Sequence, residues 1–129
     1  MRLMVLVRAT AQTELDRLPK REELAEMGKF NEQLGKAGIT ILAAEGLQPS
    51  SKGLRIRFDE GRATITDGPF TETKELIAGY WIVEVQSKEQ AVEWFSRAPM
   101  DRGMTLEVRP YFEPEDFEDN VPSQSRETA

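Results

Sequence analysis

The segment Leu3–Val7 constrains the fold of this chain most strongly, because its five consecutive apolar residues supply both faces of one strand. Successive side chains of a strand point to opposite faces, so Met4 and Leu6 would face away from their three apolar neighbours. The later segment 80–85 has the same property, with aromatic or β-branched residues on both faces. A sheet built from these strands therefore needs cover on both sides.

Periodicity along the rest of the chain predicts two helices and several short strands. Apolar residues recur at helical spacing after Pro19, and Gly38 supplies a helix C-terminus. A second helix is expected from Ser87, which has Gln90 three residues later in a capping-box arrangement, and it stops at Pro99. Strands are expected at residues 39–43, 54–59, 63–66, 80–85 and 105–109.

The resulting order is strand, helix, strand, hairpin, strand, helix, strand. It is close to a ferredoxin-like βαββαβ unit with an inserted β-hairpin, so the predicted fold class is α+β, with two helices covering one sheet face. We expect one domain over residues 1–112. Residues 113–129 are acidic and poor in apolar side chains, which is typical of a flexible tail or of an arm lying on a partner.

The second sheet face can be covered in two ways. A homodimer that packs sheet against sheet would bury it, and this is the arrangement we expect. Within one chain, the tail would instead fold back and cover the face with Tyr111, Phe112 and Phe117.

Composition excludes several kinds of chemistry and partner. The 129 residues include no Cys and no His, so thiolate nucleophiles and imidazole bases are absent and no metal site or cofactor is expected. A net charge of -6 argues against nucleic-acid binding, which usually needs a basic face. No apolar run approaches the ~20 residues of a membrane span, and the N-terminal apolar run is too short for a signal peptide. We therefore expect a cytoplasmic protein.

The turn Asp67–Phe70 is the most distinctive motif, and it permits two interpretations. In the structural one, Asp67 accepts backbone hydrogen bonds, Gly68 adopts positive φ, the proline fixes φ and Phe70 fills the core. In the functional one, the turn places Asp67, Glu72 and Lys74 at the mouth of a cleft, where a carboxylate beside a lysine transfers protons or binds a polar ligand. Phe70 of the same turn is then a ligand contact as well.

Four further side chains are candidate ligand contacts. Arg8, at the end of the first strand, and Tyr80 would line a pocket and pair with an anionic ligand. Glu45 either points into the cleft or is a charge at the end of a strand. Ser50 either orients a ligand or satisfies the backbone of its turn.

The segment Asp67–Glu75 resembles the signature of the DGPF proteins, a branch of the YCII-related family. The segment Glu45–Gly53 resembles the family's connection before its hairpin, and residues 91–94 and 107–110 resemble its second helix and last strand. The resemblance implies a dimeric α+β barrel, in which two ferredoxin-like sheets enclose a cleft. Some YCII-related proteins use a His and Asp pair in dehydrochlorinase or isomerase-like chemistry, a pair that this chain lacks. DGPF domains also occur near, or fused to, extracytoplasmic-function sigma factors of bacteria.

Two functional hypotheses follow. The first is a non-catalytic homodimer that binds a small molecule or a partner, in a regulatory context linked to sigma factors. The second is a cofactor-independent acid/base enzyme, with Asp67 or Glu72 as the base and Lys74 or Arg8 stabilising negative charge.

Overall fold

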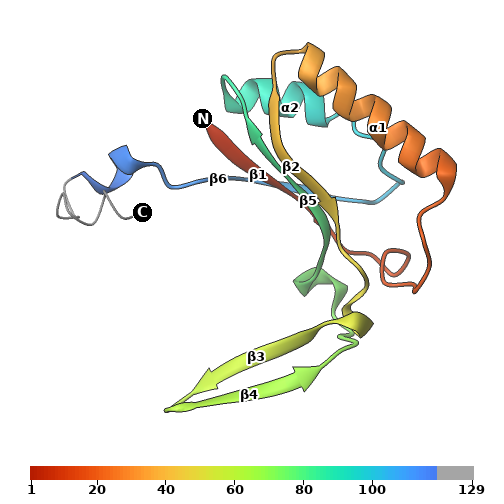
Figure 1. Cartoon of the computed structure of the whole chain (residues 1–129), viewed down its shortest axis with the longest axis vertical. Coiled ribbons are helices and arrows are strands. Elements are labelled where there is room, and N and C mark those ends of the chain that lie inside the picture. The colour runs from red at the N-terminus through yellow and green to blue at the C-terminus, as the bar shows by residue number, and fades with distance from the viewer. Residues whose placement is uncertain (119–129) are drawn as a thin grey trace.

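The computed structural model describes residues 1–118 and has a sheet at its centre, with two helices on one side of that sheet (Figure 1). The helices and strands are β1 Arg2–Arg8, α1 Arg21–Lys36, β2 Thr40–Gly46, β3 Leu54–Asp59, β4 Arg62–Asp67, β5 Ile77–Glu84, α2 Lys88–Phe95 and β6 Leu106–Pro110. Three short 3₁₀ turns lie at Ser50–Lys52, Thr73–Glu75 and Pro114–Phe117.

The main sheet has the strand order β2-β5-β1-β6, and all neighbouring strands are antiparallel. Together with one helix after β1 and one after β5, this order confirms the predicted ferredoxin-like α+β fold. Within residues 1–118, strands β3 and β4 pair only with each other, so the inserted hairpin is a separate two-stranded sheet, also as predicted. Within the described residues, neither helix is long and apolar enough to cross a membrane.

Burial along β1 alternates between its two faces in the single chain. Leu3 and Val5 are fully buried, and their register partners on β5 are Val83 and Trp81, which are buried too. These side chains form the core between the sheet and the two helices. Met4 and Leu6 belong to the opposite face, called the open face below, where they are only partly buried.

Three aromatic rings join the helices to the sheet. Phe30 of α1, Trp81 of β5 and Phe95 of α2 pack edge to face, with ring centroids 5.2–6.0 Å apart. The buried indole N-H of Trp81 donates a hydrogen bond to Asn31 Oδ1 at 2.9 Å, so its polar group is satisfied inside the core. This cluster fixes α1 over the sheet.

The end of α1 and the start of α2 follow their sequence signals. The chain leaves α1 through Gly38 with φ 87°, a conformation that glycine adopts readily. At the start of α2, Ser87 Oγ accepts a hydrogen bond from the backbone N-H of Gln90 at 3.1 Å. The Gln90 side chain also donates to the Ala37 carbonyl at 3.2 Å, which connects the start of α2 to the end of α1.

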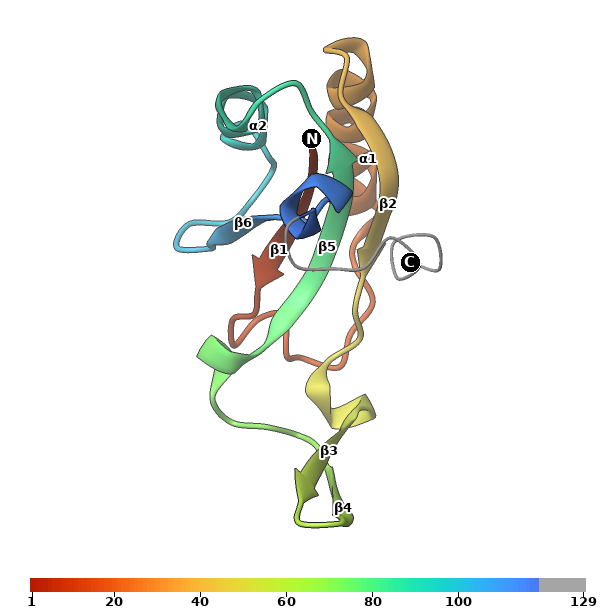
Figure 2. The same cartoon turned by 90° about the vertical axis from the view of Figure 1, so that its left-hand side faces the viewer.

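The β3-β4 hairpin projects from the sheet as an arm (Figures 1 and 2). Every residue of its two strands is exposed, although one face carries apolar side chains in register. Ile56 is paired with Ile65, and they are 53% and 64% exposed, while Phe58 is 81% exposed. An isolated hairpin with an uncovered apolar face has little stability of its own.

Residues 111–118 form a second projection, called the C-terminal arm below, which leaves the sheet after β6 (Figure 1). Its start is held by Arg2, which forms a salt bridge with Glu113 at 3.2 Å and lies 4.9 Å above the Tyr111 ring. Phe112 contacts Phe117, with ring centroids 5.2 Å apart, yet remains 75% exposed. The rest of the predicted tail, 119–129, lies outside the described residues.

Candidate functional site

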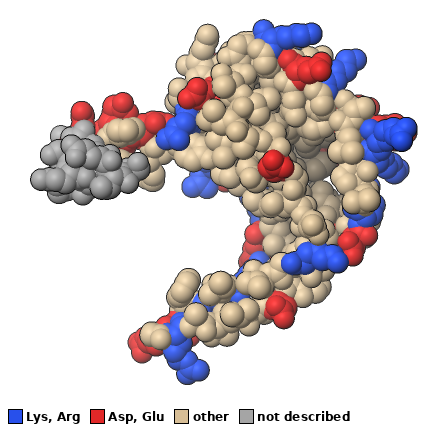
Figure 3. Space-filling view, viewed as in Figure 1, with Lys and Arg blue, Asp and Glu red and all other residues tan. Residues whose placement is uncertain are grey.

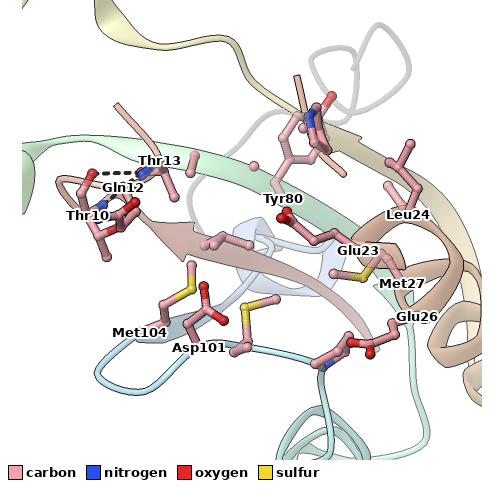
Figure 4. Close-up of a pocket in the computed structure, with 18 of the residues that line it drawn as sticks. Thr10, Gln12, Thr13, Glu23, Leu24, Glu26, Met27, Tyr80, Asp101 and Met104 are labelled. Carbon is pink, nitrogen blue, oxygen red and sulfur yellow. Dashed lines mark hydrogen bonds between the residues drawn. The ribbon is translucent and has the colours of Figure 1, made fainter. Parts of the chain in front are cut away.

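A pocket of about 580 Å³ opens between α1 and the sheet (Figure 4). One wall is the loop 9–20, which connects β1 to α1, and the opposite wall is the segment 99–104 before β6. The floor is formed by the ends of β2 and β5 that lie far from α2. This volume falls in the range of ordinary small-molecule sites.

The pocket lining combines an apolar interior with charges at its edge. Met27 of α1, Met104 and the buried Trp81 give the interior its apolar character. In Figure 4, Glu23 of α1 and Asp101 lie on opposite sides of the space. Glu23 forms an ion pair with Arg17 of the facing loop at 3.5 Å, so the charges of these two groups are balanced.

Internal hydrogen bonds shape the loop 9–20. Thr10 and Thr13 bond reciprocally: the Thr10 N-H donates to Thr13 Oγ1 at 2.8 Å, and the Thr13 N-H donates to Thr10 Oγ1 at 3.3 Å (Figure 4). The Thr13 hydroxyl also donates to the Thr10 carbonyl at 3.0 Å. The first turn of this pocket wall is therefore ordered before any ligand binds.

Two of the eight predicted ligand residues line this pocket, namely Glu45 and Tyr80. They are register partners on β2 and β5, and Tyr80 also pairs with Leu6. Because the neighbouring Trp81 points toward the helices, Tyr80 and Glu45 belong to the open face, and their strands border the pocket at its floor. The other predicted residues, Arg8, Ser50, Asp67, Phe70, Glu72 and Lys74, are outside the lining.

The Arg8 guanidinium is engaged by protein groups. It forms a salt bridge with Glu107 of β6 at 2.8 Å and also donates to the Lys74 carbonyl. Hydrogen bonds from Arg109, at 3.2 Å, and from Arg8 hold the pKa of the Glu107 carboxyl below its usual range. An anionic ligand at Arg8 would have to compete with this carboxylate.

The candidate proton-transfer residues lie at the surface near the base of the hairpin. Asp67 ends β4, and its side chain is exposed, as are those of Glu72 and Lys74. Phe70 is half-buried, and its ring lies 3.8 Å from the guanidinium carbon of Arg55. The single chain therefore does not bring these groups into the pocket.

Gly68 has a steric role that differs from the predicted one. Its φ is not positive, so the expectation of a left-handed turn residue is wrong. A Cβ at this position would overlap the carbonyl oxygen of Ser50 and lie 2.8 Å from its carbonyl carbon. The Gly68 N-H also donates to the Gly53 carbonyl at 3.0 Å. Glycine is required here because the turn sits directly on the backbone of the Ser50–Lys52 turn.

Ser50 connects three segments. Its backbone N-H donates to Glu14 Oε2 at 2.9 Å, and its hydroxyl donates to the other oxygen of the same carboxylate. The hydroxyl oxygen accepts a hydrogen bond from the Phe70 N-H at 3.0 Å. Ser50 thus joins the loop 9–20 to the Asp67–Phe70 turn.

Sequence reasoning missed most of the pocket, especially Met27, Met100 and Met104. A cluster of methionines is common at adaptable apolar binding surfaces, and this chain has five methionines among its 129 residues. Their placement around one space depends on how α1 and the segment 99–104 meet, which no local pattern states.

The fold and the pocket together define a ferredoxin-like α+β domain with a space for a small molecule between its sheet and its first helix. The YCII-related domain model matches residues 1–115, so the chain belongs to the YCII-related family and the predicted resemblance is confirmed. An uncharacterized protein of Rhizobium meliloti (strain 1021) is 33% identical over 67 residues. The match covers 50% of this chain and 53% of that protein, so the two are similar over about half of their lengths.

Proposed function

We propose that the protein is a homodimer that binds a small molecule in the pocket between α1 and the sheet, without chemical turnover. The observation that carries this proposal is the pocket itself, about 580 Å³ with Met27, Trp81 and Met104 in its lining. An apolar interior with a few charges at the edge favours a ligand that has an apolar body.

A binding function is favoured over catalysis by the positions of the candidate acid/base groups. Asp67, Glu72 and Lys74 are exposed and lie outside the pocket lining. A general base has to come within about 3 Å of the proton that it removes, directly or through one water. For these residues to contact a ligand, a second subunit would have to complete a cleft beside them.

The homodimer is proposed because one sheet face remains open in the single chain. Met4, Leu6 and Ile82 are only partly buried there, and both arms project beyond this sheet. A sheet-to-sheet homodimer would form the dimeric α+β barrel that the family resemblance implies. The same resemblance suggests a role linked to extracytoplasmic-function sigma factors, with the bound molecule as the signal. We place this role in the cytoplasm, as expected from the sequence.

Binding can be tested with the fluorescent probe 8-anilinonaphthalene-1-sulfonate. In a Trp94→Phe background, Trp81 is the remaining tryptophan and reports on the pocket that it lines. We expect the probe to quench Trp81 saturably, with a dissociation constant on the order of micromolar. Met27→Trp should weaken binding at least tenfold by filling the pocket, and binding by the tryptophan variants is followed by the emission of the probe itself, because each variant adds a second tryptophan. Val92→Trp, on an exposed position of α2, is the matched control.

Failure of the probe to bind, or equal binding by Met27→Trp and Val92→Trp, would contradict the pocket as a ligand site. Catalysis is tested separately, by following small aromatic and lactone substrates for conversion. Reproducible turnover that is abolished by Asp67→Ala, with folding preserved, would contradict the non-catalytic proposal and favour the acid/base enzyme.

A further inference from the structure

The Asp67–Phe70 turn and the ligand pocket are connected by a short chain of hydrogen bonds through Glu14. Glu14 is half-buried in the loop 9–20, between pocket-lining residues Thr13 and Arg17. Its carboxylate does not line the pocket and is directed instead to Ser50, whose N-H and hydroxyl both donate to it. The Ser50 hydroxyl oxygen in turn accepts from the Phe70 N-H at 3.0 Å.

A second contact joins the same two segments. Lys52, in the Ser50–Lys52 turn, lies 3.6 Å from the Asp16 carboxylate of the loop 9–20. The Asp67–Phe70 turn packs against the backbone of this 3₁₀ turn, where Gly68 leaves no room for a Cβ. The Ser50–Lys52 turn therefore contacts both the pocket wall and the base of the hairpin.

We infer that Glu14 is a positioning residue for the pocket. It couples ligand binding to the packing of the β3-β4 hairpin base against the Ser50–Lys52 turn, and a hairpin packed in this way is called seated below. The inference rests on the proposed small-molecule function of the pocket. Glu14 holds the loop that supplies one pocket wall, and it holds that loop to the turn on which the hairpin base sits. Because a coupling free energy between two sites is reciprocal, packing of the hairpin base that strengthens ligand binding is itself strengthened by the ligand to the same extent.

The hairpin is well suited to respond to such coupling. It makes no pairing with the main sheet, and all residues of its strands are exposed. Apart from the chain itself, the contacts at its base within the described residues are the hydrogen bond from Gly68 to Gly53, those of Phe70 with Ser50 and Arg55, and a salt bridge from Arg55 to Glu75 at 3.4 Å. A small change at the Ser50–Lys52 turn would therefore alter the orientation of an arm that is free along its length.

The coupling is tested by hydrogen-deuterium exchange of the full chain, with and without 8-anilinonaphthalene-1-sulfonate. In the unmodified protein we expect the probe to slow exchange at the loop 9–20 and also at residues 67–70, which lie outside the pocket. Glu14→Ala should abolish the slowing at residues 67–70 and weaken probe binding roughly three- to tenfold, because the carboxylate accepts two hydrogen bonds. Ser50→Ala should act in the same direction.

Glu22→Ala is the matched control, since Glu22 is exposed in the first turn of α1 and does not line the pocket. If Glu14→Ala and Glu22→Ala show equal probe affinity and equal protection at residues 67–70, the coupling is refuted while the binding function stands. If the probe does not bind the unmodified protein, the pocket function fails. The positioning role of Glu14 is then tested by hydrogen-deuterium exchange without the probe. The Phe70 amide should exchange faster in Glu14→Ala than in Glu22→Ala, and equal exchange rates would refute the positioning role.

Discussion

At the scale of single residues, Gly68 shows how a family signature can be a steric requirement. Its hydrogen replaces a Cβ that would overlap the backbone of Ser50. We expect Gly68→Ala to destabilise the protein by about 1–3 kcal/mol, as forced overpacking usually does. Urea unfolding gives this free energy, and limited proteolysis between residues 54 and 67 reports whether the hairpin has become unseated.

Gly28 provides the control for this substitution. It lies inside α1, is exposed, and has nothing within 4 Å of an added Cβ. Gly28→Ala should therefore stabilise the protein by about 0.5–1 kcal/mol through helix propensity. If the two alanine variants unfold at the same urea concentration, the close approach of Gly68 to Ser50 is not a constraint in solution.

At the scale of elements, β6 is an edge strand that a cross-strand ion pair helps to hold. Glu107 accepts from Arg109 of the same strand and from Arg8 of β1. Its pKa is lowered in the folded state, so the stabilisation is present above the ordinary Glu pKa of about 4.3 and is lost as pH falls through the folded value. We expect carbon-detected NMR to show Glu107 titrating below this ordinary value.

Removing one donor should move that titration. Arg109→Gln should raise the Glu107 pKa toward the ordinary value, whereas Arg57→Gln on the hairpin should leave it unchanged. An identical Glu107 titration in both variants would show that Arg109 does not hold the carboxylate in solution.

The elements themselves were largely predictable from sequence, because the signals for them are local. Alternation identified the hairpin, a continuous apolar run identified the two-faced strand β1, and Gly38 and Ser87 marked helix ends that the structure confirms. The pocket was not predictable in this way. It forms where α1 meets the segment 99–104, about 70 residues later in the chain. The positive φ expected at Gly68 was wrong because a tertiary contact, and not turn geometry, requires the glycine.

At the scale of the whole molecule, the single chain has a C-shaped outline (Figure 3). The hairpin arm and the body enclose a hollow on the side away from α1, and the hairpin carries uncovered apolar residues such as Phe58. Soluble monomers rarely leave a large contiguous apolar surface exposed. A second copy of the chain would cover both the open sheet face and the inner side of the arm.

We therefore expect sedimentation equilibrium to give twice the 14.7-kDa mass of one chain at micromolar concentration. Leu6→Glu places a charge on the open face, so it should raise the dissociation constant of the dimer at least tenfold. The monomer should stay folded, because this side chain is only partly buried in one chain. Phe58→Ser should weaken association to a smaller extent if the hairpin also contacts the second copy. Val92→Glu changes an exposed residue on α2, which lies on the other side of the sheet, and should leave the mass unchanged. A monomeric unmodified protein would rule out the dimer, and equal effects of Leu6→Glu and Val92→Glu would place its interface elsewhere.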